Sequence, residues 1–171
     1  SLTGLAVLSA FVYNNPNRMA RIMAFLNPDD PEAQRGFFFQ QYRGLLAFGN
    51  GGVEGLGLGN GAEKHGYLPF AHTDFIFPMV GEELGLWFAL GTVFCFALIA
   101  AYGIAISARC TDLFGRLLAA GLTCSIIVPA IMNIGVTTAV LPNTGLPLPF
   151  VSYGGTNLIF TMATVGLLIS I

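Results

Sequence analysis

Charged side chains are scarce in this sequence, since Asp, Glu, Lys and Arg together make up 9% of its 171 residues. Soluble globular proteins carry about a quarter charged residues, so this composition excludes an ordinary soluble domain. The formal net charge of −2 and the lack of a long basic tract also exclude a nucleic-acid-binding module. Hydrophobic residues reach 54% and the mean hydropathy is +0.72, which is typical of an integral membrane protein.

The few charges leave two long stretches without any charged side chain, residues 84–108 and 117–171. A membrane-spanning helix needs roughly 20 apolar residues, so each stretch can cross a bilayer. The second stretch is too long for one crossing, because a single helix of that length would measure roughly 80 Å. The prolines and glycines of residues 141–157 (LPNTGLPLPFVSYGGTN) provide the break. The sequence therefore predicts an all-α integral membrane protein, a polytopic helical bundle.

The orientation of the predicted bundle follows from its short connections. Arg109 and Arg116 flank the connection 108–116, whereas residues 142–153 carry no charge. Lys and Arg mark cytoplasmic loops, so the connection 108–116 is expected inside the cell and the acidic and basic residues 14–78 outside.

The predicted organisation is a single fragment of a larger polytopic domain, because the sequence lacks an initial methionine and stops inside an apolar helix. Its segments, in order, are the end of a span (1–13), a large extracytoplasmic loop (14–78), a span (79–107), a cytoplasmic loop (108–116), a span (117–140), an extracytoplasmic loop (141–156) and the start of a last span (157–171).

The predicted loop 14–78 holds 13 of the 18 ionisable side chains and is expected to contain two short helices. The first has an apolar stripe that either lies in the lipid interface or packs on neighbouring spans. This stripe consists of Met19, Ile22, Met23 and Leu26. The second helix is expected to start after a cap at Asp29 or Asp30. Its expected buried face is formed by Phe38, Gln41, Tyr42 and Leu45, and its end by Gly49, Gly51 and Gly52.

Two other features carry no recognisable site. Cys95, Cys110 and Cys124 do not have the spacing of a metal site, so we interpret them as reduced packing residues. The glycines of 55–61 (GLGLGNG) fit neither the phosphate-binding loop nor the dinucleotide-binding fingerprint. They indicate a flexible or tightly turned backbone that a ligand could approach closely.

Two longer motifs are similar to a known family. GLGLGNGAEKHGYLPFAHTDFIFPMVGEELG (55–85) and NIGVTTAVLPNTGLPLPFVSYGG (133–155) together closely resemble the SEDS family (shape, elongation, division and sporulation), which includes FtsW, RodA and SpoVE. The resemblance runs from about Gln40 to the end of the sequence. Asn60, Lys64, the YLP of 67–69 and the AHTDFIF motif fit the FtsW division branch better than the RodA elongation branch. The resemblance places this chain in the C-terminal portion of such a protein.

The resemblance implies a peptidoglycan glycosyltransferase of cell division, an inverting enzyme of the bacterial inner membrane at the septum. Its substrate would be lipid II, an undecaprenyl-diphosphate-linked disaccharide peptide that is polymerised into glycan strands on the outer face. Its partners would be a class B penicillin-binding protein, which cross-links the product, and other division proteins. The family aspartate of the HTDF motif falls on Asp74, which would act as the general base.

The same resemblance implies a set of substrate-binding candidates around Asp74. They are Lys64, His72, Thr73, Ser152, Tyr153, Gly154 and Gly155. The departing diphosphate needs positive charge, which Arg and Lys side chains or a divalent cation such as Mg²⁺ can supply. The cations of this segment are Lys64, which lies nearest to the motif, and Arg18, Arg21, Arg35 and Arg43. Metal dependence is left open.

Simpler interpretations exist for most of these residues. Asp74 precedes a predicted span and could be its N-cap. Residues 152–155 could form only the turn into the last span. Glu82 and Glu83 are expected to face water, a polar neighbour or a cavity, because carboxylates facing lipid are costly.

Two other functions remain as alternatives, a lipid II flippase and a non-catalytic division scaffold. A transporter predicts charges or broken helices at mid-depth in the membrane. The predicted spans are uncharged and the acidic residues gather at one side, which favours chemistry at the membrane surface.

Overall fold

The structure of the chain is a computed structural model that describes residues 16–27, 38–61 and 74–171. Every regular element within these residues is a helix, which confirms the predicted all-α class. The helices are α2 (Pro16–Leu26), α4 (Phe39–Gly51), α5 (Ile76–Arg109), α6 (Leu113–Thr137) and α7 (Gly155–Ser170). The predicted span end at 1–13 and the predicted cap at Asp29 or Asp30 lie outside the described residues.

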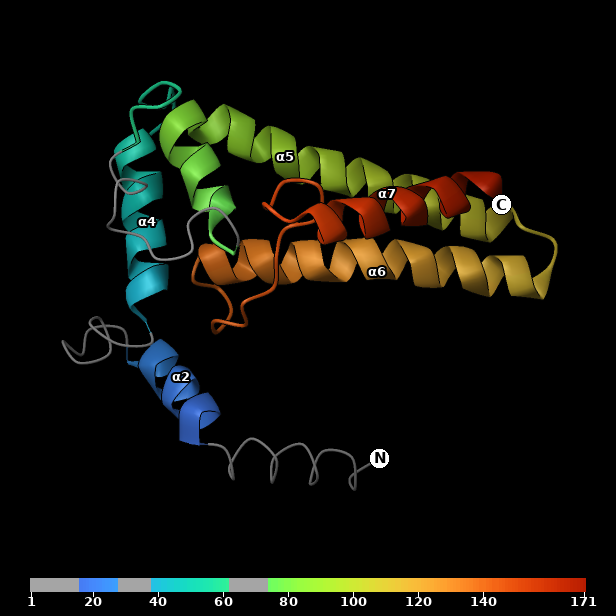
Figure 1. Cartoon of the computed structure of the whole chain (residues 1–171), viewed down its shortest axis with the longest axis horizontal. Coiled ribbons are helices and arrows are strands. Elements are labelled where there is room, and N and C mark those ends of the chain that lie inside the picture. The colour runs from blue at the N-terminus through green and yellow to red at the C-terminus, as the bar shows by residue number, and fades with distance from the viewer. Residues whose placement is uncertain (1–15, 28–37, 62–73) are drawn as a thin grey trace.

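The helices α5 and α6 are long and apolar enough to cross a membrane, and α7 is a shorter apolar helix. The long part of α5 packs on α6, and α6 packs on α7, so the three run side by side (Figure 1). Only 17% and 28% of the most apolar windows of α5 and α6 are buried, and large side chains such as Trp87, Phe94 and Phe160 point outward. Outward-facing apolar side chains are compatible with contact to lipid or to further helices, because lipid tails are as apolar as these side chains.

One helix that the sequence predicted as an uninterrupted span, 79–107, is broken. Gly85 has φ 81° and ψ −177°, so α5 consists of a short arm (76–84) and a long arm (86–109) that run in different directions (Figure 1). The long arm measures about 36 Å at 1.5 Å per residue, which is enough to span a bilayer without the short arm. The predicted span 79–107 lies within α5, and the residue at which the membrane crossing begins stays a prediction.

The break is held by residues 52–61, which we call the glycine clamp. Leu56 N–H donates to the Glu82 carbonyl oxygen at 2.9 Å, and Gly57 N–H donates to the Glu83 carbonyl oxygen at 2.9 Å. On the other side of the break, Leu86 N–H donates to the Gly52 carbonyl oxygen at 3.1 Å. These bonds satisfy backbone groups that the broken helix leaves without an intrahelical partner. The glycines of the clamp form the predicted tightly turned backbone, and Gly55 lies close to the backbone of residues 83–85. Close approach of a ligand stays a prediction.

The helix α4 packs on the short arm through small residues. Its buried residues are Gln41, Gly44, Ala47 and Gly51. The predicted face was right for Phe38 and Gln41 and wrong for Tyr42 and Leu45, which are 38% and 41% exposed. Glycine allows this close packing, since a Cβ at Gly51 would lie 2.6 Å from the Glu82 Cα. Of the three glycines predicted to end this helix, Gly51 is its last residue and Gly52 its C-cap, whereas Gly49 lies within the helix.

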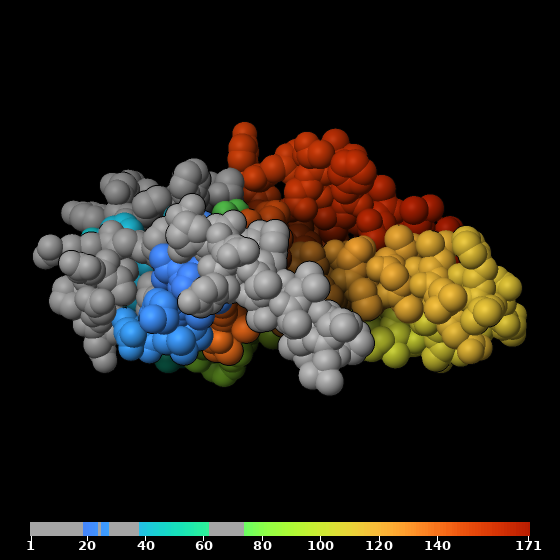
Figure 2. All heavy atoms as spheres, turned by 90° about the horizontal axis from the view of Figure 1, so that it is seen from below, coloured from blue at the N-terminus to red at the C-terminus, as the bar shows by residue number. Residues whose placement is uncertain are grey.

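The helix α2 is attached through Phe25, which packs on Phe38, and Ala139 packs on the same ring. The predicted apolar stripe is only partly covered, because Met23 is 54% exposed and Leu26 64% exposed. Both alternatives for this stripe therefore stay predictions. In the space-filling view, α2 (blue) lies at the end of the molecule away from the tip where α5 connects to α6 (Figure 2).

The connection 141–154 lies at the same end of the long helices as α2 and α4. Asn143 Nδ2 donates to Gln40 Oε1 at 2.8 Å, and Arg21 Nη1 donates to the Asn143 carbonyl oxygen at 3.4 Å. The short connection at Cys110 lies at the opposite end (Figure 1). The two segments predicted outside the cell thus share one end, and the side of the membrane that this end faces remains a prediction.

That side can be tested with thiol labelling of the full-length protein in intact cells. Cysteines introduced at the exposed Asn60 and Thr144, with Cys95 and Cys124 replaced by alanine, should react with a membrane-impermeant reagent added outside. Native Cys110 should react only after permeabilisation. Labelling of Cys110 in intact cells would instead put the Asp74 end of the molecule in the cytoplasm.

Candidate functional site

Asp74 lies in the turn just before the short arm of α5, and its side chain is half-buried. The N-cap position of α5 is occupied by Phe75, and no side chain makes a capping hydrogen bond there. The interpretation of Asp74 as an N-cap is therefore wrong. No hydrogen bond or ion pair joins the Asp74 carboxylate to another of the residues that the structure describes, and the residue lies at the end of the bundle that also holds the connection 141–154.

The carboxylate lies beside Gly145 in the connection between α6 and α7. A Cβ built on Gly145 would be 3.4 Å from Asp74 Oδ2, and Gly145 has φ 67°, a conformation that favours glycine. Gly145 N–H donates to Asn143 Oδ1 at 3.3 Å, which shapes this turn. The sequence motifs at Asp74 and at residues 141–156 are thus brought together although they are far apart in the chain.

A buried amide of α6 joins these two segments. Asn133 is 2% exposed, and its Nδ2 donates to the Asp74 carbonyl oxygen at 2.7 Å and to the Leu146 carbonyl oxygen at 2.6 Å. Asn133 was not among the residues predicted for the site. The signal was available, because an amide inside an uncharged predicted span needs polar partners in its surroundings.

The base of the site is fixed by apolar packing and a second amide. Phe75 is 1% exposed and belongs to a core cluster with Ala47, Met79 and Val136. Gln41 of α4 donates from Nε2 to the carbonyl oxygens of Val136 at 2.9 Å and of Leu141 at 2.7 Å. These contacts anchor the end of α6 and the start of the following connection.

The predicted substrate-binding residues 152–155 separate into two kinds. The Ser152 hydroxyl is buried and accepts the Leu148 N–H at 2.7 Å, so it closes a turn. Gly154 occupies the N-cap position of α7, and Gly155 is the first residue of that helix. Tyr153 is 84% exposed. The geometry favours the turn interpretation for Ser152 and the two glycines, and it leaves Tyr153 as the residue of this group best placed to meet a ligand.

Three further predicted site residues, Lys64, His72 and Thr73, lie outside the described residues, as does Arg35. Of the remaining cations, Arg21 bonds to the Asn143 carbonyl oxygen, on the same connection as Gly145. The Arg43 guanidinium carbon lies 5.4 Å from the centre of the Phe39 ring, a cation–π contact on α4. The structure therefore brings Arg21 to the connection beside Asp74.

The two glutamates next to the break, Glu82 and Glu83, lie against the glycine clamp. Glu83 Oε2 accepts the Gly59 N–H at 3.0 Å, which agrees with the expected polar neighbour. Glu82 is fully buried, and a Cβ at Gly61 would lie 2.8 Å from its Oε2. Both carboxylates thus belong to the surroundings of the glycine clamp.

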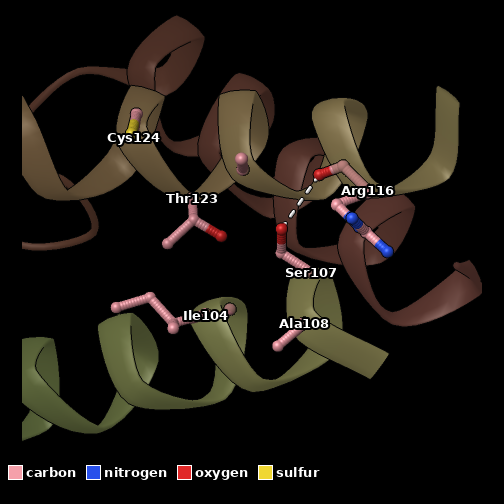
Figure 3. Close-up of a pocket in the computed structure, with 8 residues that line it drawn as sticks. Ile104, Ser107, Ala108, Arg116, Thr123 and Cys124 are labelled. Carbon is pink, nitrogen blue, oxygen red and sulfur yellow. Dashed lines mark hydrogen bonds between the residues drawn. The ribbon is translucent and has the colours of Figure 1, made fainter. Parts of the chain in front are cut away.

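A cavity of about 380 Å³ lies between α5 and α6 at the opposite end of the molecule (Figure 3). Its lining residues are Gly103, Ile104, Ser107, Ala108, Arg116, Ala120, Thr123 and Cys124. Ser107 Oγ donates to the Arg116 carbonyl oxygen at 3.0 Å, and Arg116 Nη2 donates to the Cys110 carbonyl oxygen at 3.3 Å. These two hydrogen bonds hold the connection between α5 and α6. The cavity is therefore separate from Asp74, which lies at the other end of the bundle.

The three cysteines are free, as predicted. Cys95 and Cys124 are exposed, and Cys124 lines the cavity between α5 and α6. Their predicted packing role therefore stays a prediction.

A family model described as "Cell cycle protein", covering FtsW, RodA and SpoVE, matches residues 1–171. The chain belongs to this family. The resemblance based on the two sequence motifs is thereby confirmed for the FtsW/RodA/SpoVE family.

Individual members of the FtsW/RodA/SpoVE family align with nearly the whole chain. The "Probable peptidoglycan glycosyltransferase FtsW" of Geobacter metallireducens is 44% identical over 167 residues, which cover 98% of this chain and 44% of that protein. The "Stage V sporulation protein E" of Bacillus subtilis is 39% identical over 171 residues, which cover 99% of this chain and 46% of that protein. The chain thus spans less than half the length of these relatives.

One solved structure shares the fold. A chain in "Structural coordination of polymerization and crosslinking by a peptidoglycan synthase complex" matches with a TM-score of 0.72 at 30% identity. The match covers 98% of this chain and 47% of that chain. Together with the two long apolar helices, it identifies the fold as that of a helical membrane protein.

Proposed function

We propose that this chain carries the catalytic aspartate of a peptidoglycan glycosyltransferase that polymerises lipid II into glycan strands during septal cell-wall synthesis. The observation that carries the proposal is the position of Asp74. Its carboxylate caps no helix, its backbone is bonded to a buried amide, and it lies beside the connection between α6 and α7. The names of the FtsW relatives support the same reaction class.

The proposed chemistry gives Asp74 one defined task. A sugar hydroxyl of one lipid-linked substrate attacks the anomeric carbon of another, and a new C–O bond forms as the bond to the diphosphate breaks. Asp74 accepts the hydroxyl proton, a contribution of about 10²–10⁴ in rate. Because the diphosphate leaves from the face opposite to the attack, the configuration at the anomeric carbon is inverted.

The departing diphosphate must be stabilised by positive charge, and Arg21 is the described cation best placed for this. Its guanidinium is exposed and is attached to the Asn143 carbonyl oxygen, on the connection that also carries Gly145. A divalent cation such as Mg²⁺ is the alternative. The described segments contain no group of three or more His, Cys, Asp or Glu side chains that could hold a metal ion, so we derive no step through one.

The proposed setting is the bacterial inner membrane at the division septum. We propose a class B penicillin-binding protein as the partner that cross-links the product, together with other division proteins. The structural neighbour belongs to a peptidoglycan synthase complex that coordinates polymerization and crosslinking, which supports this pairing.

The break in α5 is the one observation that favours a lipid II flippase, because transporters use broken helices in the middle of the membrane. Here, however, the break lies at the end of the long arm, which by itself is about 36 Å long. The long arm before Arg109, α6 after Arg116 and all of α7 carry no charged side chain. This arrangement favours chemistry at the membrane surface over transport through the bundle.

The deciding experiment uses the full-length protein in liposomes with purified lipid II, with and without the class B partner, whose transpeptidase site is blocked by a β-lactam. We expect long glycan strands that a muramidase digests. Transfer of lipid II across the bilayer without polymer would establish the flippase. If neither activity appears while the complex with the partner still forms, the scaffold function is supported.

A further inference from the structure

We propose that Asn133 is a positioning residue, which fixes the Asp74 carboxylate relative to the connection between α6 and α7. The inference rests on the proposed role of Asp74 as general base. It adds a residue of α6 that touches no reacting atom and acts through the backbone of the two segments between which the carboxylate lies.

The hydrogen bonds of Asn133 define its orientation. Its two acceptors, the carbonyl oxygens of Asp74 and Leu146, can only accept, so the amide nitrogen must face both of them. A primary amide has two N–H groups, and this geometry uses both. One side chain thus joins the turn before α5 to the connection after α6. In the chain, Asp74 is 59 residues from Asn133 and Leu146 is 13 residues from it.

The two bonded carbonyls lie on either side of the carboxylate. The Asp74 carbonyl belongs to the same residue as the carboxylate, and Leu146 follows Gly145, the residue beside Asp74 Oδ2. Asn133 itself is buried within α6, where its backbone carbonyl oxygen accepts a hydrogen bond from the Thr137 hydroxyl at 2.8 Å. If the amide is lost, the two segments can shift against each other, and a displacement of about 1 Å can slow a reaction about a hundredfold.

The loss of Asn133 should also affect stability. Its Oδ1 is buried and has no hydrogen-bond partner among the described residues, so removing this oxygen removes one unfavourable burial. Removing the two donated bonds, however, leaves the carbonyl oxygens of Asp74 and Leu146 without this partner, which costs stability. The effect on the reaction rate must therefore be compared with that of a variant that loses a similar pair of hydrogen bonds.

The chain offers a matched control in Gln41. This amide is 1% exposed and likewise donates two hydrogen bonds, to the carbonyl oxygens of Val136 and Leu141. Gln41 therefore holds the start of the same connection, and these two bonds do not reach the turn that carries Asp74. Replacing Gln41 removes an equal number of buried bonds without releasing that turn.

The experiment measures lipid II polymerisation by the full-length protein with its partner for Asn133→Leu, Gln41→Leu, Asp74→Asn and the double variant Asn133→Leu/Asp74→Asn. For Asn133→Leu we expect kcat to fall at least about tenfold, with the KM for lipid II within about twofold of wild type. For Gln41→Leu, the logarithm of kcat should fall by less than half as much as for Asn133→Leu. The two variants should have similar apparent melting temperatures. In the Asp74→Asn background, Asn133→Leu should cause no further loss, because both changes disable the same group.

Two results would overturn the positioning role. One is equal activity of Asn133→Leu and Gln41→Leu, and the other is an Asn133→Leu effect that multiplies with that of Asp74→Asn. Should Asn133→Leu fail to accumulate, Asn133→Ser, which keeps one donor, enters the same comparison. A slow Asp74→Asn with a fast Asn133→Leu refutes only the positioning role, whereas a fast Asp74→Asn refutes the proposed base and this inference with it.

Discussion

The Asp74→Asn variant of the full-length protein should polymerise lipid II at least about a hundredfold more slowly than wild type. Asparagine has nearly the size and shape of aspartate but cannot accept the proton of the attacking hydroxyl. Asp74 makes no capping bond to α5 and its carboxylate is only half-buried, so folding should be nearly unaffected. The measurement is a single-turnover polymerisation rate at saturating lipid II, with binding of the class B partner followed separately.

The matched control is Asp112→Asn at the other end of the bundle. Asp112 is a true N-cap, since its Oδ2 accepts the Gly115 N–H of α6 at 3.0 Å. Asparagine is an equally good N-cap, so this variant should keep both stability and rate. Polymerisation by a well-folded Asp74→Asn at more than about a tenth of the wild-type rate would remove Asp74 from the mechanism. A comparable loss in Asp112→Asn would point to general damage by carboxylate removal.

The uncharged runs, together with the prolines and glycines that interrupt the second run, were sufficient to predict the long apolar helices. They predicted spans at 79–107, 117–140 and from 157, and the structure has α5, α6 and α7 there. The ends differ by two to four residues, and at the connection between α5 and α6 the helices include charged side chains. Arg109 ends α5 and Arg116 lies in the first turn of α6, where both were assigned to the loop.

The break at Gly85 could not be predicted, because it depends on contacts between distant segments. Gly85 follows Glu82 and Glu83 and precedes a long apolar run, but a glycine in such a place does not by itself break a helix, and Gly91 lies within the regular part of α5. The conformation is set by the glycine clamp, whose backbone takes the place of the next helical turn. For the same reason the buried face of α4 was assigned to the large residues Tyr42 and Leu45, although close approach to the short arm selects small ones.

The sequence predicted two segments of the candidate site but not the residues that hold them together. The HTDF motif indicated Asp74, and the connection 141–156 was identified from its prolines and glycines. Asn133 joins these two segments and Gln41 holds the start of the connection 141–156, and the partners of both amides are backbone carbonyls. Backbone acceptors leave no pattern in a sequence, so neither amide could be matched to its partners before the fold was known.

The Gly85→Ala variant should lose at least about 3 kcal/mol of stability, from backbone strain and from a clash with the glycine clamp. At φ 81° and ψ −177°, Gly85 occupies a region that is almost restricted to glycine. A Cβ there would lie 2.5 Å from the Val53 carbonyl oxygen and 2.6 Å from the Gly55 nitrogen. Both are backbone atoms, so no side-chain rotation can relieve the contact.

This change also affects the site, because the short arm begins directly after Asp74 and its direction is set at Gly85. A variant that survives by straightening α5 would break the bonds from Leu56 N–H to Glu82 and from Leu86 N–H to Gly52. The short arm would then leave α4, and Asp74 would leave Gly145. We therefore expect Gly85→Ala protein that does accumulate to polymerise lipid II at least about a hundredfold more slowly as well.

The control for Gly85→Ala is Gly91→Ala in the long arm of the same helix. Gly91 has an ordinary helical backbone and a Cβ there would meet no atom within 4 Å, so alanine should be neutral or stabilising by about 0.5–1 kcal/mol. Apparent melting temperatures in detergent, read from the fraction that stays monodisperse after heating, separate the two. If Gly85→Ala melts at the temperature of Gly91→Ala and keeps its polymerisation rate, α5 is not broken at Gly85 in the membrane. The short arm would then be a continuation of the span, and Asp74 would have to reach its substrate from a different position.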